Sequence, residues 1–269
     1  VEICVSGKST LKKPEECIAF ARENDWQKRY ENFAQACLNV VPKVSVIVLT
    51  YNNLILNKAC IDSILSKTAY SNYELIILDN NSTDGTIEYL HKLDEKRYPQ
   101  IKIIYNSHNS GFAGGNNKAI SEASGKYIML LNNDTVVTRG WLTNAVKHLE
   151  NDAECGMCGA VTNSIGNEAM IKVNYTNLKE LDEFAFGYTT THNNQIYTDV
   201  DRLAMFCTLI RKDIMNKYGL LDENYQVGMF EDDDYAKVIE KAGYTLYIAE
   251  DVFVHHVNNA SFKKLESKE

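Results

Sequence analysis

VSVIVLTYNN, residues 44–53, is the stretch of sequence that decides the fold. Its first six residues form a nearly continuous run of β-branched and other apolar side chains, which is typical of a strand covered on both faces. The run ends in the polar sequence Thr50-Tyr51-Asn52-Asn53. In open sheets of parallel strands, ligands bind beyond the carboxyl ends of the strands. We therefore expect the main domain to begin here, with a binding site at the polar end of this strand.

Strand-like and helix-like segments alternate after this stretch. Further strands are expected at 73–78, 101–105, 127–131 and 245–249, and helices at 54–65, 113–123 and 232–242. This alternation predicts an α/β fold, a mostly parallel Rossmann-like sheet flanked by helices. Residues 163–201 lack a clear period, and around 189–194 we expect a long irregular excursion.

The termini are expected to lie outside this domain. Residues 14–38 begin with a proline and two glutamates and space their aromatic side chains three or four apart, which predicts one amphipathic helix. We expect an N-terminal helical extension at 1–43, the main domain at 44–262 and a charged tail at 263–269. The sequence does not begin with Met, and its charged last residues do not complete a helix or strand. We therefore expect it to be part of a longer multidomain polypeptide.

Composition excludes several classes of function. The formal charge is −8 and no Lys/Arg block stands out, so a nucleic acid is not expected as a partner. No window approaches the roughly 20 apolar residues of a membrane span, and residues 1–25 are too charged for a signal peptide. We expect a cytoplasmic location, with peripheral attachment at the inner membrane face as the alternative. The seven cysteines, including the Cys155/Cys158 pair, are interpreted as reduced core thiols.

Polar side chains follow three of the predicted strands. They are Thr50 to Asn53, Asp79 to Gly85 and Asn132 to Thr135. The polar residues at any one of these strand ends, which we call tips, are explained by their preference for turns and helix caps. All three tips, however, should converge on the crevice where this architecture binds nucleotides. A fourth segment, GFAGGNN at 111–117, follows the third strand and opens a helix, so its N–H groups can approach a diphosphate. It matches neither the dinucleotide pattern nor the P-loop.

Two residues are candidate metal ligands. Asp134 follows a buried strand, where a carboxylate can hold Mg²⁺ or Mn²⁺ against substrate phosphates. The alternative is a cap for the helix that ends near Glu150. His256 closes the apolar run 252–254, and its nitrogen would favour Mn²⁺ over Mg²⁺, although a structural role stays open.

The acidic cluster at 231–234 offers a candidate general base. Acidic residues in the first turn of a helix are stabilised by the helix dipole, which explains the cluster without a function. Four consecutive carboxylates also repel one another, and the flanking aromatic residues indicate partial burial, which raises a carboxyl pKa. Glu231, Asp232 and Asp233 are the catalytic candidates.

Six segments in this order resemble family 2 glycosyltransferases of the GT-A fold, from about Val44 to Phe262. They are Thr50-Tyr51-Asn52, DNNSTDGT at 79–86, GFAGGNN at 111–117, LLNNDT at 130–135, FEDDDY at 230–235 and the histidine pair 255–256. The resemblance implies a GT-A fold and a nucleotide-sugar donor.

The resemblance also implies roles for residues. Tyr51, Asn52 and Asp79 match nucleoside contacts. The nucleotide-binding set that we predict is Thr50, Tyr51, Asn52, Asp79, Asn81, Asp84, Gly111, Asn117, Asn132 and Asn133. Asn132-Asn133-Asp134 occupies the DxD position with Asn in place of the first Asp, so Asp134 is the principal metal carboxylate. His256 completes the metal site, and Asp232 is the base that deprotonates the acceptor.

The implied reaction is transfer of one sugar, with inversion, from a nucleoside diphosphate sugar to an acceptor hydroxyl. We expect UDP, with dTDP and GDP as alternatives, and an acceptor on a glycan, lipid-linked or protein-linked saccharide. One alternative is a non-catalytic module that binds nucleotide-sugar or glycan. Another is a sugar nucleotidyltransferase, which the missing G-x-G-T-R signature after the first strand disfavours.

Overall fold

The computed structural model describes residues 14–96, 98–225 and 230–257. The chain divides into two compact units, Val1–Pro42 and Lys43–Glu269, and each is described by itself. The predicted tail at 263–269 lies outside the described residues, as do the last residues of the predicted main domain. Within the described part of the chain, no helix combines the length and the apolar character that crossing a bilayer requires.

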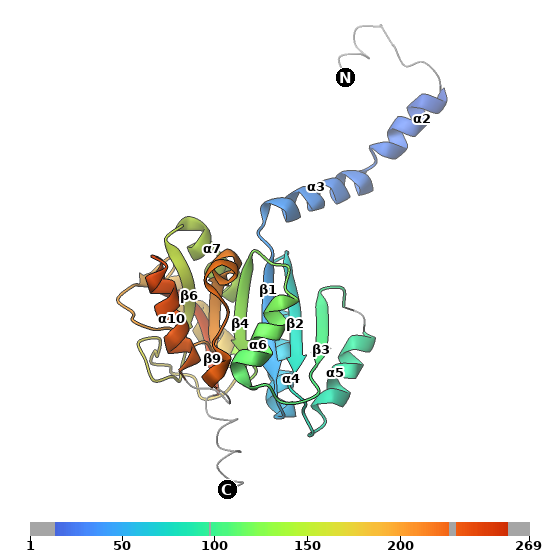
Figure 1. Cartoon of the computed structure of the whole chain (residues 1–269). Coiled ribbons are helices and arrows are strands. Elements are labelled where there is room, and N and C mark those ends of the chain that lie inside the picture. The colour runs from blue at the N-terminus through green and yellow to red at the C-terminus, as the bar shows by residue number, and fades with distance from the viewer. Residues whose placement is uncertain (1–13, 97, 226–229, 258–269) are drawn as a thin grey trace. The chain divides into compact units, whose positions relative to one another are not determined.

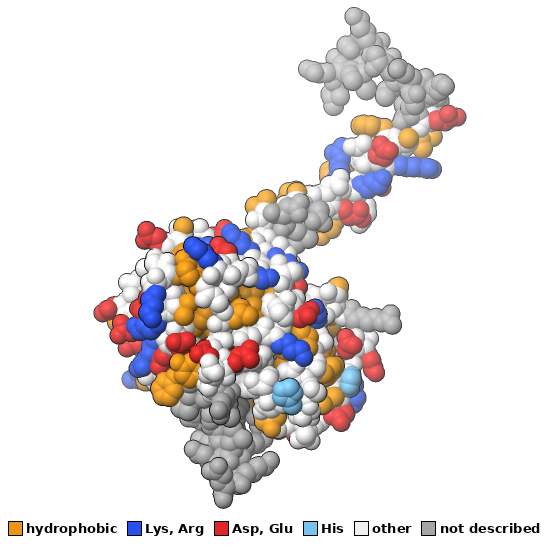
Figure 2. Space-filling model, in the orientation of Figure 1, with side chains coloured by type: hydrophobic (Ala, Val, Ile, Leu, Met, Phe, Trp, Pro, Cys, Tyr) orange, Lys and Arg blue, Asp and Glu red, His pale blue; other side chains and the backbone are white. Residues whose placement is uncertain are grey.

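The first unit contains two helices, α2 (Pro14–Glu23) and α3 (Trp26–Val40), so the prediction of one helix over 14–38 was wrong (Figure 1). The Asn24 side-chain amide and N–H both donate to the Phe20 carbonyl at 3.0 Å and end α2. Asp25 then accepts from the Lys28 N–H at 2.8 Å and starts α3 as its N-cap. Hydrophobic side chains lie on the surface of this unit (Figure 2), Trp26 and Phe33 among them.

The second unit is built on a sheet whose first half is parallel. The strands β1 (Val44–Thr50), β2 (Tyr73–Asp79), β3 (Ile101–Tyr105) and β4 (Tyr127–Asn132) pair in the order β3-β2-β1-β4. These four strands confirm the predicted runs, and their buried β-branched and leucine side chains explain why both faces are covered. The order reverses between β1 and β4, which makes that junction the topological switch point.

Helices cover both faces of this half. α4 (Leu54–Lys67) and α5 (Thr86–Glu95) connect strands in one direction along the sheet, and α6 (Gly111–Ser121) returns from β3 to β4. Right-handed crossovers in opposite directions place their helices on opposite faces. α6 accordingly crosses in front of the strands in Figure 1. α5 occupies a segment where no helix was predicted.

The second half of the sheet is mixed. β8 (Cys207–Arg211) is antiparallel to β4 and to β6 (Cys155–Val161), and β6 is parallel to β9 (Thr245–His256). Two short strands, β5 (Thr135–Val137) and β7 (Ile196–Tyr197), pair antiparallel with β9. The strands β1–β4, β6 and β9 therefore share one direction within the described residues. The remaining elements are α7 (Trp141–Asn151), α9 (Lys212–Tyr218), a 3₁₀ turn (Glu223–Tyr225) and α10 (Glu231–Lys241).

The expected irregular excursion was right only in part, because residues 163–180 and 192–195 form no helix or strand apart from one isolated bridge, whereas α8 (Leu181–Thr191) lies between them. Thr and Gly are weak helix formers, so the sequence pattern alone did not indicate a helix. Packing overrides that preference: the rings of Phe184 and Tyr188 lie 5.2 and 6.3 Å from the ring of Phe253 in β9. The helix thereby covers the second half of the sheet.

β9 is longer than the predicted strand at 245–249, and its pairing with β6 is irregular after Ala249. A buried ion pair stands at this irregularity, where Asp251 Oδ1 lies 2.6 Å from His148 Nε2. Burial would raise the pKa of Asp251, but His148 and the Asn194 N–H together lower it. The strand continues past this point to deliver His256 to the carboxyl edge of the sheet.

Candidate active site

Strand register places the predicted polar tips in one row. Thr50 in β1 pairs with Asp79 in β2, and Leu49 pairs with Asn132 in β4. The three carboxyl ends therefore stop at the same level on the two sides of the switch point. This confirms the predicted convergence of the three tips.

A buried asparagine that the sequence analysis missed joins these tips. Asn57 in α4 is fully buried, and its amide donates to the Asn52 carbonyl at 2.8 Å and to the Thr86 hydroxyl at 3.1 Å. Its Oδ1 accepts from Asn133 Nδ2 at 2.6 Å. Asn57 lies on the same helix face as buried Cys60, Ile61 and Ile64. The sequence does carry a signal for Asn57, because it is a polar residue among apolar residues on one face of a helix.

Asp79 lies inside the protein. Its carboxylate accepts from the Thr50 hydroxyl at 2.9 Å, and from the Ser82 hydroxyl and N–H at 2.5 and 2.8 Å. Asp79 and Thr50 are both fully buried. These bonds fix the turn after β2 against the end of β1, and Ser82 in turn accepts from the Asn52 N–H. A direct contact of Asp79 with a nucleoside stays a prediction.

Tyr51, Asn81 and Asp84 form the exposed rim of the same turn region. Asn52 and Asn81 have positive φ angles of 54° and 69°, which L-residues rarely adopt and which are frequent at binding sites. Burial would raise the pKa of Asp84, but hydrogen bonds from Thr86 and from the Leu54 N–H outweigh burial and lower it. Asp84 therefore stays ionised and holds the start of α4.

The glycine-rich segment forms the first turns of α6, which begins at Gly111 with a φ angle of 73°. A Cβ at Gly115 would lie 2.5 Å from Leu49 Cδ1, so only glycine allows this approach of α6 to β1. Asn117 is bound to the chain itself: its amide donates to the Leu221 carbonyl at 2.8 Å and to Glu223 at 2.9 Å. Its described contacts position residues 221–223, and a nucleotide contact stays a prediction.

Asp134 and His256 lie together, as the pairing of β5 with β9 requires. His256 Nε2 is 3.2 Å from Asp134 Oδ1, and both side chains are about nine-tenths buried. His256 Nδ1 lies 3.1 Å from the Ser164 carbonyl, which can only accept, so a hydrogen bond there requires the proton on Nδ1. In neutral His256 the lone pair of Nε2 then faces the carboxylate. Two lone-pair donors at this distance suit a divalent cation.

The described residues place no third Asp, Glu, His or Cys beside this pair in a metal-binding group. A site with two protein ligands leaves coordination positions for substrate phosphates and water, which is how Mg²⁺ is usually held. Asn132 and Asn133 are partly exposed beside it. The residues present therefore fit a cation shared with a bound diphosphate.

Two residues that support His256 were missed. Asn163 holds its backbone in both directions, accepting from the His256 N–H at 2.8 Å and donating to its carbonyl at 3.1 Å. The Phe206 ring stacks on the imidazole, with ring centroids 5.1 Å apart and an angle of 14° between the planes. These contacts fix the position of the ring, and the local sequence at either residue carries no signal for them.

The acidic cluster begins α10 directly after Phe230, whose φ angle is 75°. Glu231 is buried, whereas Asp232 and Asp233 are partly exposed. Burial raises the pKa of Asp232 and outweighs the hydrogen bond from the Asp233 N–H, which lowers it; the Asp233 charge raises the pKa further, and Arg202 has a smaller lowering effect. A carboxylate with a raised pKa is a better proton acceptor than an ordinary one. Of the three catalytic candidates, Asp232 fits best.

Residues 202–206 connect the acidic cluster to the Asp134/His256 pair. Arg202 Nη1 lies 3.7 Å from Asp233 Oδ2, while Phe206 stacks on His256. Five consecutive residues span at most about 14 Å between their outer Cα atoms. These five residues therefore link the acidic cluster to the Asp134/His256 pair, while a common site for the two sets of carboxylates stays a prediction.

Solved glycosyltransferases share this fold. GalNAc-T7 in complex with UDP, GalNAc and Mn²⁺ superposes with a TM-score of 0.64 at 15% identity, over 80% of this chain and 44% of that one. Mannosyltransferase PcManGT from Pyrobaculum calidifontis, with GDP-Man and Mn²⁺, gives 0.63 at 19% identity, over 91% and 69%. The chain therefore has the fold of these proteins, the GT-A fold.

The chain belongs to glycosyl transferase family 2, whose family model matches residues 45–219. The UDP-Glc:alpha-D-GlcNAc-diphosphoundecaprenol beta-1,3-glucosyltransferase WfaP of Escherichia coli is 35% identical over 109 residues, 40% of this chain and 42% of that protein. The chain spans half or less of the length of the first curated relatives it matches.

Proposed function

We propose that the chain transfers a single sugar from a nucleoside diphosphate sugar to a saccharide hydroxyl, with inversion at the anomeric carbon. The observation that carries this proposal is the pairing of Asp134 with His256 at the carboxyl ends of the parallel strands, and residues 202–206, which contact His256 and Asp233, support it. UDP is our preferred nucleotide, and dTDP and GDP are the alternatives. The acceptor is a glycan or a saccharide linked to lipid or protein.

The donor binds at the switch point in this proposal. The nucleoside lies against Tyr51 and Asn52, on the rim between β1 and β2, and the diphosphate reaches toward Asn133 and Asp134. The Asn57 hydrogen bonds support this arrangement, because they hold the turn at Asn52 and the loop at Asn133 in one fixed relation. A rigid site lowers the entropy lost when the donor binds.

Asp134 and His256 would hold Mn²⁺ or Mg²⁺, which when bound neutralises charge on the diphosphate leaving group. The orientation of His256 supports this role, since the Ser164 carbonyl leaves Nε2 available. Asp232 would take the proton of the acceptor hydroxyl while that oxygen attacks. Its raised pKa supports this assignment, because a stronger base makes the proton transfer more favourable. No covalent bond between sugar and protein is needed.

A screen of nucleotide-sugars by thermal unfolding, with and without Mn²⁺, tests the proposal. A donor at a hundred times its Kd stabilises the folded state by about 2.7 kcal/mol, which corresponds to a shift of roughly 5 °C or more. We expect such a shift for UDP-sugars only when Mn²⁺ is present. In Asp134→Ala the shift should disappear, whereas Asp94→Ala, which removes an exposed carboxylate of α5, should retain it.

The products of the reaction test the proposed catalysis and its stereochemistry. Transfer to a saccharide acceptor with inverted anomeric configuration, read by proton NMR, supports the catalytic proposal. Nucleotide-sugar binding without transfer or hydrolysis across the acceptors tried would favour the non-catalytic binding module. A product with retained configuration would contradict the role of Asp232 as a base.

A further inference from the structure

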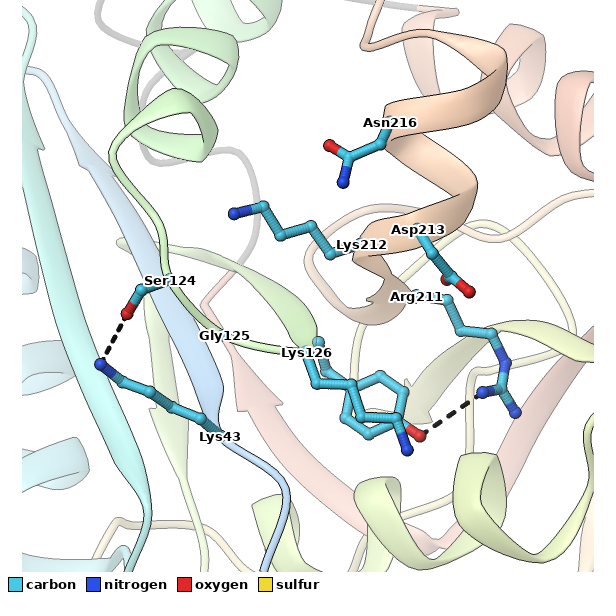
Figure 3. Close-up of a pocket in the computed structure, with 9 residues that line it drawn as sticks. Lys43, Ser124, Gly125, Lys126, Arg211, Lys212, Asp213 and Asn216 are labelled. Carbon is cyan, nitrogen blue, oxygen red and sulfur yellow. Dashed lines mark hydrogen bonds between the residues drawn. The ribbon is translucent and has the colours of Figure 1, made fainter. Parts of the chain in front are cut away.

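A second cavity lies at the end of the sheet opposite the candidate active site. It has a volume of about 570 Å³, within the range of small-molecule sites, and lies where β1 and β4 begin and β8 ends (Figure 3). β4 runs from Lys126 and Tyr127 in this cavity to Asn132 beside Asp134. Six residues of strand span about 20 Å, so the two sites are separate.

Cationic side chains dominate the lining. Lys43, Lys126, Arg211 and Lys212 line the cavity, against one carboxylate, Asp213. This concentration stands on a chain whose formal charge is −8. In Figure 3 the Asp213 carboxylate lies on the Arg211 side and points away from the Lys212 ammonium group.

Two of the four cations are paired with acids. Lys43 Nζ lies 2.9 Å from Glu74, and Lys126 Nζ lies 2.5 Å from Glu150. Burial would raise the pKa of Glu74, but hydrogen bonds from Ser45, Ser124 and Lys43 lower it to about 2. The charges of Lys43 and Lys126 are therefore largely balanced at neutral pH.

The other two cations differ in their surroundings. Arg211 donates to the backbone carbonyls of Cys155, Leu149 and Asp152, and its charge lowers the pKa of the nearby Glu150 and Asp152 carboxyls, which partly balance it. Lys212 donates to the Ala123 carbonyl and has no carboxylate partner within the described residues. This neutral acceptor satisfies a hydrogen bond but does not balance the charge, so the Lys212 ammonium group favours an anion beside it.

Donor groups are available on the wall formed by α9. The Lys212 ammonium group uses one N–H in its described bond, so further protons remain for a ligand. The Asn216 amide lies beside it and, in Figure 3, both point into the same opening, across from Ser124 and Lys43. Together Lys212 and Asn216 offer an anion a charged donor and an amide, whereas the Ser124 hydroxyl already donates to Glu74.

We propose that this cavity binds the phosphate group of a small phosphorylated saccharide, with Lys212 as the main phosphate contact. A phosphate accepts charge-assisted hydrogen bonds from Lys, and the neutral polar groups and remaining volume suit sugar hydroxyls. The surface is too small for a nucleic acid, which needs a longer row of cations. The proposal is independent of the activity at the other end of the sheet.

Calorimetric titration of the full chain with glucose 1-phosphate, in EDTA to exclude metal-dependent binding, tests the proposal. We compare wild type with Lys212→Ala, Asn216→Asp and Lys217→Ala. Each change lowers the net charge by one unit, and Lys217 lies on the same helix outside the cavity. Asn216 is exposed, so its variant keeps the proposal testable if Lys212→Ala folds poorly.

We expect wild type and Lys217→Ala to bind equally, and Lys212→Ala and Asn216→Asp to bind about ten- to a hundredfold more weakly. Glucose, which lacks the phosphate, should not bind. The proposal is overturned if wild type shows no binding at millimolar glucose 1-phosphate. It is also overturned if Lys217→Ala weakens binding as much as Asn216→Asp, because the effect would then be one of net charge alone.

Discussion

The two halves of the sheet build their parts of the candidate site in different ways. In the parallel half, the tips after β1, β2 and β4 are held by a dense set of buried side-chain hydrogen bonds around Asn57 and Asp79. In the mixed half, the acidic cluster and His256 are placed by a few contacts between distant segments, such as Asn163 with His256. In the proposed reaction the first half acts as a rigid support, and the second supplies the reacting groups.

This difference predicts a division of mutational effects. Changes among the reacting groups of the mixed half should reduce the rate of transfer and leave folding intact. Changes in the buried network of the parallel half should reduce stability together with donor binding. The predictions below are ordered by the size of the expected effect.

Asp232→Asn should reduce kcat by about 10²- to 10⁴-fold, because general base catalysis contributes a factor of this size. Donor binding should stay within about twofold of wild type, since Asp232 does not contact the nucleotide in this account. Steady-state kinetics and calorimetry measure the two quantities. Asp234→Asn, a matched change in the same turn, should keep most activity. Undiminished turnover in Asp232→Asn would reject the assignment of the base.

Asn57→Leu should destabilise the fold by about 2–5 kcal/mol and weaken donor binding. The substitution leaves the Asn52 carbonyl and the Asn133 amide, both partly buried, without their partners, and a buried group left in this way costs about 1–3 kcal/mol. Denaturant unfolding measures the effect, with Asn151→Leu at an exposed helix position as the control. A variant with wild-type stability would show that Asn57 does not hold the two tips together.

Asn163→Ala should weaken Mn²⁺-dependent donor binding by about tenfold while changing kcat at saturating metal much less. Residues that orient a metal ligand typically contribute factors of this size. Activity as a function of Mn²⁺ concentration gives the measurement. Asn167→Ala, in the same loop, removes an amide that contacts Ala169 instead of His256 and should leave the metal dependence unchanged. Equal effects of both variants on the Mn²⁺ dependence would mean that the conformation of the loop, rather than the Asn163 contact with His256, determines metal binding.

The acid side of the pH profile should depend on Asp232. Burial raises the pKa of Asp232 above 3.8. As pH is lowered, the decrease in kcat should therefore begin at a higher pH than for an ordinary carboxylate base. Arg202→Ala removes a charge that lowers this pKa, so the acid limb should move to still higher pH. The effect of Asp232 on folding stability has the opposite pH dependence to its effect on kcat. Its contribution to the free energy of unfolding is present at low pH and is lost as pH rises through the raised pKa. An acid limb that does not move in Arg202→Ala would contradict this coupling.

The same difference between the two halves explains which parts of the fold and of the candidate site could be predicted from the sequence. In the parallel half each strand and tip is a local pattern, so β1 to β4 and their convergence followed from the sequence. In the mixed half the decisive contacts join residues far apart, such as Asn163 and His256 at a separation of 93 residues. α8 was missed for the same reason, since Phe253 rather than local propensity supports it. His256 was a candidate ligand from its position after an apolar run, and the family resemblance supplied its expected pairing with Asp134.

The central claim is that Asp134 and His256 share one cation in front of the donor site. Anomalous diffraction from crystals grown with Mn²⁺ and UDP tests it most directly. The account predicts one strong manganese peak about 2.0–2.2 Å from Asp134 Oδ1 and His256 Nε2, in contact with the diphosphate. A manganese ion bound elsewhere, or UDP bound in the site with these two side chains still in direct contact and no metal between them, would contradict it.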